Sequence, residues 1–201
     1  MINDVSKQII KNFNSELFVE TGLFRGSTAV VVRSWFKDLK IVEIEINPVY
    51  CGYGKSIFRN DKNTTIVNAD SKSYLSSQIM NFSQYNNPVF YLDAHWDPAN
   101  WPLRGEIESI SRLDKPIIII DDFKTPNSDG TISDRHGYDS YMGQDCDKEY
   151  VADLIKPYTD CIFYAKEPTV DGQGCGIIFI NRNHDEIAKL VNMDDFISEK
   201  L

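Results

Sequence analysis

Short apolar runs alternate along the chain with stretches of helical periodicity, a pattern that predicts a parallel β-sheet flanked by helices. Turn-forming or charged residues bound each run, as is expected at the ends of strands. The runs predicted as strands are Leu17–Glu20, Lys40–Glu45, Thr65–Asn68, Pro88–Leu92 and Lys115–Ile120. The last run, KPIIII, is the most apolar in the chain, which is typical of a central strand buried on both faces.

Helices are predicted between these strands. Asn47-Pro48 ends the second strand and begins a helix, because proline fits the first helical turn. Ile107, Ile110 and Leu113 recur at helical spacing after the fourth strand. The predicted helices cover residues 4–13, the segment from the first turn to about Phe36, residues 48–58, Ser71–Met80, Pro102–Leu113 and Lys148–Lys156.

The last third of the chain departs from this alternation. Residues 124–147 are polar and rich in turn formers, and a loop of that length inside a compact domain is usually functional or mobile. Strands are predicted at Cys161–Ala165 and Gly176–Ile180, with no helical pattern between them, which indicates an antiparallel strand at the sheet edge. We therefore predict a doubly wound, Rossmann-like α/β fold in which a single domain spans residues 1–201.

Composition narrows the function classes. The chain has 201 residues, 42% of them hydrophobic, which suits one globular domain with a substantial core. Its formal net charge of -9 disfavours nucleic acid as a partner. No apolar run has the length of a signal peptide or membrane span, so we expect a cytoplasmic protein without membrane contact. The four cysteines are scattered, and reduced thiols are expected rather than a zinc or redox motif.

A glycine-containing turn follows the first predicted strand. It runs from Glu20 through Thr21, Gly22 and Gly26 to Thr28. Gly22 would let the backbone approach a ligand closely, since no Cβ intervenes. The spacing is not GxGxxG, so a dinucleotide pyrophosphate site is disfavoured. An ordinary strand-to-helix turn is the alternative.

Two further polar positions end the next strands. Glu45 closes the second strand, and a carboxylate there can accept both hydroxyls of a ribose, although Glu45 could also be a solvated strand end. Asp70 and Ser71 close the third strand. Asp70 can accept from an adenine amino group, while capping of the helix at Ser71 is the alternative.

Three carboxylates follow the fourth and fifth strands. Asp93 ends YLD, and Asp121-Asp122 ends IIIIDD, so all three are expected above one edge of the sheet. Converging carboxylates repel one another unless a cation or protons intervene. A hard divalent ion, most naturally Mg²⁺, would resolve the repulsion and lower the pKa of a substrate hydroxyl. The alternatives are a helix cap with a solvated acid, or a metal-free site with a lone general base.

The order ETGLFRGST, IEINP, NADS, YLDAHW and IIDDF resembles the class I S-adenosylmethionine-dependent methyltransferases over nearly the whole chain. The resemblance implies a seven-stranded sheet with an antiparallel seventh strand. It also implies that Gly22 and Gly26 flank the methionine of the cofactor, that Glu45 binds the ribose, and that Asp70 with Ser71 binds the adenine. The predicted cofactor contacts are Glu20, Thr21, Gly22, Gly26, Ser27, Thr28, Glu45, Asp70, Ser71 and Asp93.

The segments YLDAHW, PLRGEI and IIIDDF are similar, more specifically, to those of the macrocin-type sugar O-methyltransferases, which are metal-dependent. By that resemblance Asp93, Asp121 and Asp122 are the metal ligands. The residue two after the first ligand is an acidic general base in some members and is His95 here. A histidine can take a proton near pH 7, so the predicted catalytic residues are His95, Asp93 and Asp122. A structural role for His95, and Asp97 as the base, stay open.

The predicted function is O-methylation of a sugar or glycosylated small-molecule hydroxyl, with S-adenosylmethionine as cofactor, S-adenosylhomocysteine as product and Mg²⁺ as helper. Residues 124–147 are interpreted as a lid or recognition segment, and Trp96 and Trp101 as stacking or packing residues. A small saccharide acceptor, or a second subunit in a homo-oligomer, would complete the pocket. A catechol-like phenol acceptor is the first alternative, although the lysine usual in that group is replaced by Trp96. A non-catalytic methyltransferase-like binding module is the second.

Overall fold

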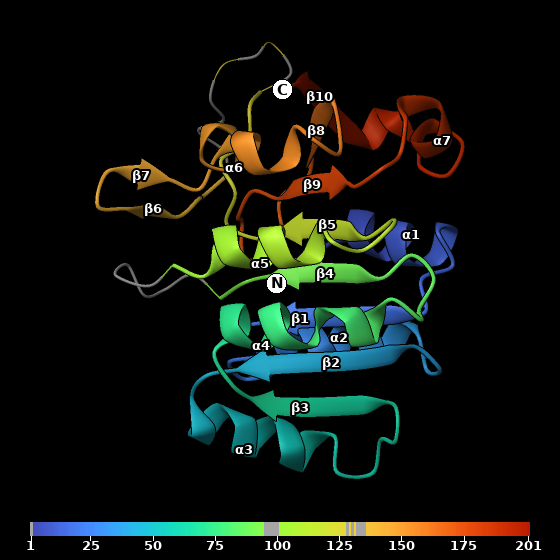
Figure 1. The fold of residues 1–201 in the computed structure, drawn as a ribbon, viewed down its shortest axis with the longest axis vertical. Helices are drawn as coiled ribbons and strands as arrows, with labels where there is room; N and C mark the ends of the chain where they lie inside the picture. The colour runs from blue at the N-terminus through green and yellow to red at the C-terminus, as the bar shows by residue number, and fades with distance from the viewer. Residues whose placement is uncertain (1, 95–100, 128, 130, 132–135) are drawn as a thin grey trace.

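A computed structural model describes residues 2–94, 101–127, 129, 131 and 136–201. One twisted sheet crosses the molecule, with the strand order β10-β8-β9-β5-β4-β1-β2-β3 (Figure 1). Its strands are β1 (Leu17–Thr21), β2 (Lys40–Glu45), β3 (Thr64–Asn68), β4 (Val89–Leu92), β5 (Ile117–Ile120), β8 (Cys161–Ala165), β9 (Gly176–Phe179) and β10 (Phe196–Lys200). A separate two-stranded hairpin is formed by β6 (Ser140–Tyr141) and β7 (Gln144–Asp145).

The doubly wound α/β fold with an antiparallel edge strand is confirmed, but the strand count is corrected and the edge is a different strand from the one indicated by the sequence. The described sheet has eight strands rather than seven. The antiparallel strand β9 is not at the edge, because it lies between β5 and β8. The edge is instead β10, a second antiparallel strand that pairs with β8. Its sequence, FISEK, is short and half polar and has a buried residue only at its start, so it carries little strand signal.

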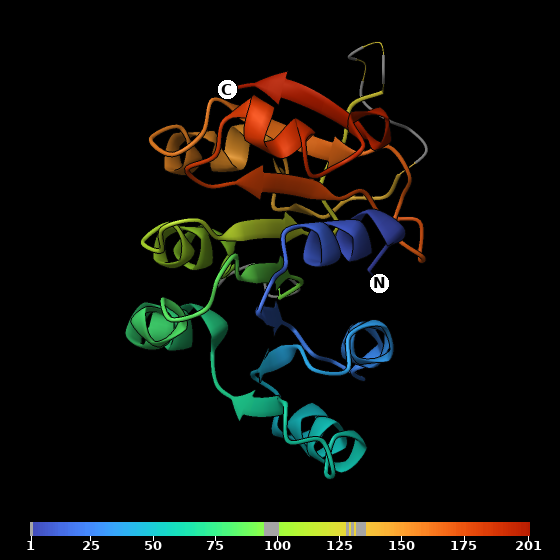
Figure 2. The same ribbon diagram turned by 90° about the vertical axis from the view of Figure 1, so that its right-hand side faces the viewer.

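Helices cover both faces of the sheet (Figure 2). On one face lie α1 (Asp4–Asn12), α2 (Ser27–Trp35), α3 (Pro48–Ile57) and α7 (His184–Ala188), and on the other lie α4 (Ser71–Gln78), α5 (Leu103–Ile110) and α6 (Lys148–Ile155). Short 3-10 helices occur at η1 (Ile79–Phe82) and η3 (Met193–Asp195). Each face has its own apolar core, since residues alternate sides along every strand: Phe18 and Ile41 pack on the α1 side, and Val19 and Ile44 on the α5 side.

Local sequence explains where the helices begin. Asn3, Asn47, Asp70 and Asp147 each precede a helix, and each side chain accepts a hydrogen bond from a backbone N–H of the first turn. Such caps satisfy amide groups that have no partner within the helix. Pro48 follows Asn47 at the first helical position, as the sequence predicted.

None of the helices among the described residues has the length and hydrophobicity needed to cross a membrane.

Candidate functional site

The carboxyl ends of the parallel strands meet along one edge of the sheet, here called the rim. Backbone hydrogen bonds continue past the strand ends and join neighbouring strands there. Asp93 N–H donates to the carbonyl of Thr21 at 3.0 Å, and Gly22 N–H to that of Ile44 at 2.9 Å. Likewise, Ala69 N–H donates to the carbonyl of Glu45 at 3.0 Å. The structure therefore brings the glycine turn, Glu45 and Asp93 to one rim.

Gly22 is required by its contact with Asp93. Its φ is +86°, a left-handed conformation that glycine adopts without strain. A Cβ at this position would lie 2.3 Å from the carbonyl oxygen of Asp93. The close approach that the sequence predicted for a ligand is thus already made by the end of β4, which packs the turn directly beside Asp93.

Glu45 holds the glycine turn in place. Its Oε2 accepts a hydrogen bond from Phe24 N–H at 2.8 Å, and its Oε1 accepts one from Asn47 N–H at 2.7 Å. The side chain is only 6% exposed. Each carboxylate oxygen can accept a second hydrogen bond, so a pair of ribose hydroxyls can still be bound here. Gly26, with φ +75°, then ends the turn as the N-cap of α2.

Asp70 and Ser71 lie at the end of β3, two strands from β1. Asp70 caps α4, because its Oδ1 accepts a hydrogen bond from Ser73 N–H at 2.8 Å. The capping role that the sequence allowed for Asp70 is therefore confirmed. Asp70 stays half-buried beside the rim while Ser71 is buried, and adenine binding by this pair stays a prediction.

The remaining predicted cofactor contacts differ in their accessibility. Ser27 is exposed at the start of α2, whereas Glu20, Thr21 and Thr28 are buried. The Thr28 hydroxyl donates a hydrogen bond to Glu20, which lowers the pKa of that carboxyl, but burial and the nearby Glu43 raise it more strongly. Cofactor contact by Glu20, Thr21, Ser27 and Thr28 stays a prediction.

Asp121 is the most buried of the three carboxylates of the predicted metal site. It is 2% exposed, and its Oδ2 accepts a hydrogen bond from the Tyr91 hydroxyl at 2.6 Å. Its Oδ1 accepts one from Asp122 N–H at 3.1 Å. Burial raises the pKa of Asp121, and it raises the pKa of Tyr91 well above its usual value.

The three predicted metal ligands differ in burial, and binding of Mg²⁺ by them stays a prediction. Asp93 and Asp122 are partly exposed at the ends of β4 and β5, whereas Asp121 is buried. Over the part of the chain that the structure describes, no group of three or more His, Cys, Asp or Glu side chains is arranged to hold a metal ion. The Tyr91 hydroxyl donates to one Asp121 oxygen, a contact that was not predicted from the sequence.

Asp122 has an unusual backbone conformation. Its φ is +51°, which a side chain other than glycine rarely adopts and which is frequent at functional sites. The Asp122 carbonyl accepts a hydrogen bond from Asp139 N–H at 2.8 Å, so the loop after β5 is tied back onto the strand end. His95, the predicted general base, lies outside the described residues, as do Trp96, Asp97 and Arg135.

Trp101 is a packing residue. Its ring stacks on the ring of Tyr150 in α6, with 4.6 Å between the ring centroids. The guanidinium carbon of Arg104 also lies over the Tyr150 ring, 5.6 Å from its centroid. Of the two interpretations that the sequence left open, packing is the one that the structure supports.

The described part of residues 124–147 is anchored beside the rim. Lys124 N–H donates to the carbonyl of Cys146 at 2.7 Å, and Gly137 N–H donates to that of Gly172 at 3.0 Å. The Thr125 hydroxyl contacts His136 Nδ1 at 2.9 Å. The β6–β7 hairpin extends from this anchored base past the carboxyl ends of the strands (Figure 1). This location suits the predicted recognition segment.

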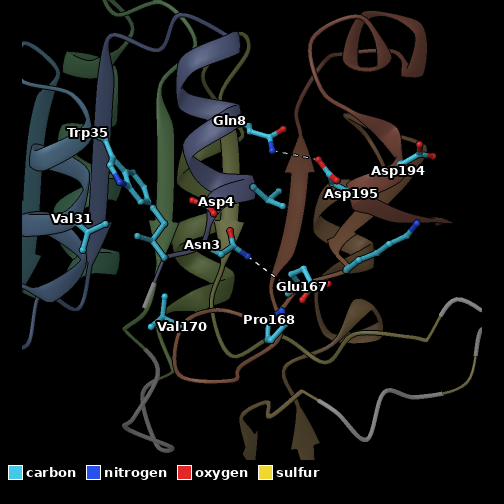
Figure 3. A pocket seen from close by; sticks show the side chains of 13 residues that line it. Asn3, Asp4, Gln8, Val31, Trp35, Glu167, Pro168, Val170, Asp194 and Asp195 are labelled. Carbon is cyan, nitrogen blue, oxygen red and sulfur yellow. Dashed lines mark hydrogen bonds between the residues drawn. The ribbon is translucent and has the colours of Figure 1, made fainter.

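Among the open pockets formed by described residues, two lie on the side of α1, α2 and α3. One, of about 600 Å³, lies beside the glycine turn and is lined by Arg25, Asn47, Val49, Tyr50, Tyr53 and Ile57. The other, of about 450 Å³, lies beside the first half of α1 and is also lined by Trp35, Glu167 and Asp195 (Figure 3). No predicted site residue lines the second pocket.

Known proteins resemble this chain in fold but not in sequence. No protein-family model and no curated protein matches the chain. Solved structures do match it. A putative caffeoyl-CoA O-methyltransferase from Staphylococcus aureus is 18% identical, with a TM-score of 0.59 over 90% of this chain and 85% of that one.

Two further structures show how broadly the fold is shared. The O-methyltransferase TomG from Streptomyces achromogenes, solved with SAM, is 12% identical with a TM-score of 0.57, over 90% of this chain and 82% of its own. Spermidine synthase from Thermotoga maritima is 15% identical with a TM-score of 0.58, over 94% of this chain and 60% of its own. The described chain therefore has the α/β fold of the class I S-adenosylmethionine-dependent methyltransferases.

Proposed function

We propose that the chain is an S-adenosylmethionine-dependent O-methyltransferase acting on the hydroxyl of a sugar or glycosylated small molecule. One observation carries the proposal: the glycine turn is pressed against the backbone of Asp93, while Glu45 bonds to the same turn through Phe24. A nucleoside-binding carboxylate and the end of β4 thus border the same part of the rim. The crevice at the carboxyl ends of the strands is where doubly wound sheets bind their ligands.

The residues present fit this cofactor. Glu45 would hold the ribose hydroxyls, and Asp70 with Ser71 would hold the adenine at the end of β3. When bound, S-adenosylmethionine supplies an electrophilic methyl group. Asp93 and Asp122 are partly exposed carboxylates on adjacent strands, where either can orient an acceptor hydroxyl and take its proton. His95 is the other candidate base.

The acceptor class rests on the resemblance of YLDAHW, PLRGEI and IIIDDF to sugar O-methyltransferases. The anchored segment around His136 and the β6–β7 hairpin would contact the acceptor at the side of the rim next to β5. Because the acidic protein repels phosphate backbones, we propose an acceptor that is not a nucleic acid. Mg²⁺ assistance through Asp93, Asp121 and Asp122 stays a prediction, since one Asp121 oxygen accepts a hydrogen bond from Tyr91 and no step of the mechanism needs the metal.

Calorimetric titration with S-adenosylmethionine and S-adenosylhomocysteine tests cofactor binding. We expect micromolar to submillimolar affinity, and at least a tenfold loss in Glu45→Gln, because an amide accepts fewer hydroxyl hydrogen bonds than a carboxylate. Lys55→Gln is the control, because Lys55 is exposed on α3, the helix that follows Glu45. This variant should bind both ligands as the wild type does. Absence of binding of either ligand at millimolar concentration would end the proposal.

Methyl transfer is then measured with a panel of monosaccharides and a catechol, each with EDTA and with added Mg²⁺. The proposal expects product with a sugar and its loss in Asp122→Asn without loss of cofactor affinity. If only the catechol is methylated, the acceptor is a phenol and the proposed sugar acceptor is wrong. Activity that needs Mg²⁺ would support metal assistance, and Tyr91→Phe, which frees one Asp121 oxygen, should then increase Mg²⁺ affinity.

A further inference from the structure

A pair of buried glutamates lies beneath the glycine turn. Glu20 on β1 is directly opposite Glu43 on β2 in the parallel register, so both side chains project from the same face of the sheet. Glu20 is 1% exposed and Glu43 is 0% exposed. Two carboxyl groups in this position cannot both be ionised without severe desolvation and repulsion.

The part of the chain that the structure describes provides few donors to this pair. Thr28, in the first turn of α2, donates to Glu20. The Oε2 atom of Glu20 and both oxygens of Glu43 find no hydrogen-bond donor among the residues that the structure describes. Carboxylates only accept hydrogen bonds, so the two side chains can bond to each other only if they hold a proton between them.

The surroundings favour that proton. Burial is the largest effect on both groups and raises the pKa of Glu43 to about 8. Asp121 adds a further repulsion to Glu20. The one basic side chain of α2, Arg33, is paired with Asp61 at 2.6 Å. Asp121 is in turn surrounded by Tyr91 and Cys175, whose own pKa values are raised by burial.

The pair is also placed next to the proposed cofactor site. Glu20 is followed by Thr21 and Gly22, and its donor Thr28 follows the other turn glycine, Gly26. S-adenosylmethionine carries a positive sulfonium that S-adenosylhomocysteine lacks. A fixed positive charge over a buried acid favours the ionised form of the acid, and the effect is strong where water is excluded.

We propose that Glu20 and Glu43 form a proton-sharing pair that discriminates the charged cofactor from its neutral product. This inference rests on the proposed function. Binding of S-adenosylmethionine releases the shared proton to solvent, which leaves a negative pair beneath the sulfonium. After methyl transfer the positive charge is gone, the pair takes a proton back, and the product is held less tightly. By linkage, the preference for the charged cofactor rises with pH.

The test measures the affinities of S-adenosylmethionine and S-adenosylhomocysteine by calorimetry between about pH 6 and about pH 9. In the wild type the affinity ratio should rise about tenfold in favour of S-adenosylmethionine. In Glu43→Gln the amide can donate to Glu20, which then stays ionised, so the ratio should vary less than about twofold beyond the ligand's own titration. Glu186→Gln, the same change at the opposite edge of the sheet, should behave as the wild type.

Carboxyl ¹³C NMR of the wild type gives a second readout that needs no variant. The titration midpoint of the pair should be lower with S-adenosylmethionine bound than with S-adenosylhomocysteine bound. Equal midpoints, or ratios that change with pH equally in the wild type and Glu43→Gln, would overturn the inference while leaving cofactor binding intact. Failure of both ligands to bind would overturn the inference together with the proposed function.

Discussion

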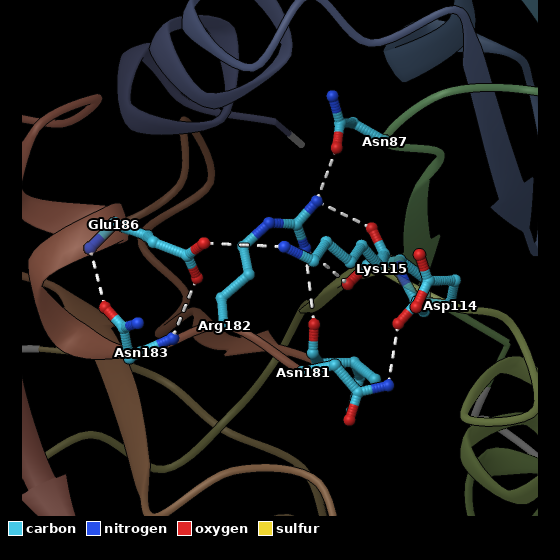
Figure 4. Close-up of polar contacts among 9 residues, drawn as sticks. Asn87, Asp114, Lys115, Asn181, Arg182, Asn183 and Glu186 are labelled. Atoms are coloured by element: carbon cyan, nitrogen blue, oxygen red, sulfur yellow. Dashed lines mark hydrogen bonds and ion pairs between the residues drawn. The ribbon is translucent and has the colours of Figure 1, made fainter.

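Buried ionisable side chains have many hydrogen-bond partners at the amino ends of the strands and few at the carboxyl ends. At the amino edge, opposite the rim, Arg182 is 8% exposed and sits among polar partners (Figure 4). Its guanidinium donates to Asn87 Oδ1 at 2.6 Å and to the carbonyl of Lys115 at 2.7 Å. Longer bonds reach the carbonyls of Pro116 and Ile180. The Phe13 ring centre lies 5.2 Å from the guanidinium carbon.

At the rim, Glu20 and Glu43 are buried even more completely but are bonded far less. Thr28 is the donor to Glu20, and Glu43 depends on Glu20 itself. Burial lowers the pKa of Arg182 to about 10, which still leaves it charged near neutral pH, whereas burial moves the pKa of Glu43 into the range where it titrates. A buried charge whose hydrogen bonds are all made stabilises one structure. A buried ionisable group with few hydrogen bonds changes its protonation state when its surroundings change.

Removing the satisfied charge should have the largest effect on stability. Arg182→Ala leaves several carbonyls at the amino edge without a donor and opens space beside Phe13. We expect the free energy of unfolding to fall by about 4 kcal/mol, measured by urea denaturation. Cofactor affinity should not change, because Arg182 lies at the far edge. Arg182→Lys keeps the charge and should lose about half as much; an equal loss would mean that the planar hydrogen bonds matter more than the charge.

Removing one member of the poorly bonded pair should act through pH. Since burial raises the pKa of Glu43 from 4.5 to about 8, the folded protein holds a proton that the unfolded chain releases. The stabilisation from this proton is complete below about pH 4.5 and disappears as the pH rises to about 8. We expect the wild type to lose about 3 kcal/mol between about pH 5 and about pH 8, and Glu43→Gln about 1 kcal/mol. Parallel curves for the two proteins, from denaturation at each pH, would contradict the buried pair.

The rim itself can be tested at Gly22. Gly22→Ala forces a Cβ against the Asp93 carbonyl at a φ of +86°, so the turn must move. We expect about 2 kcal/mol of destabilisation and at least a tenfold loss of cofactor affinity. Gly52→Ala is the matched control, since a Cβ there meets nothing within 4 Å and the residue is helical. It should be neutral or slightly stabilising; equal effects of the two substitutions would remove the special role of the turn.

Much of the fold could be predicted because its signals are local. The run IIII of β5 and the cap Asn47-Pro48 each specify their element almost alone. β10 could not be predicted, because FISEK is paired on one side only and gains its burial from β8, far away in sequence. The place of β9 inside the sheet was missed for a related reason: strand order is set by packing between distant segments, not by the pattern of any one of them.

The candidate site was predictable as a location but not as a set of contacts. Glu45 and Asp93 were assigned to the rim because strand ends are visible in the sequence. The bond between Tyr91 and Asp121 was not, since it depends on which face each side chain takes across β4 and β5. Glu43 was not singled out from the sequence, although it lies inside a predicted strand and is buried opposite Glu20. The signal that was missed is a glutamate inside one predicted strand that can lie opposite a glutamate in the neighbouring strand.

The smallest effect is expected from the exposed ion pair beside Arg182. Lys115 Nζ lies 3.4 Å from Glu186 Oε1, and both side chains are about two-fifths exposed, so water and salt screen the attraction. Lys115→Gln keeps the backbone carbonyl that Arg182 uses. We expect a change below about 0.5 kcal/mol in the free energy of unfolding, further reduced at high salt. A loss near that of Arg182→Ala would show that the amino edge is held together by its surface charges and not by the buried guanidinium.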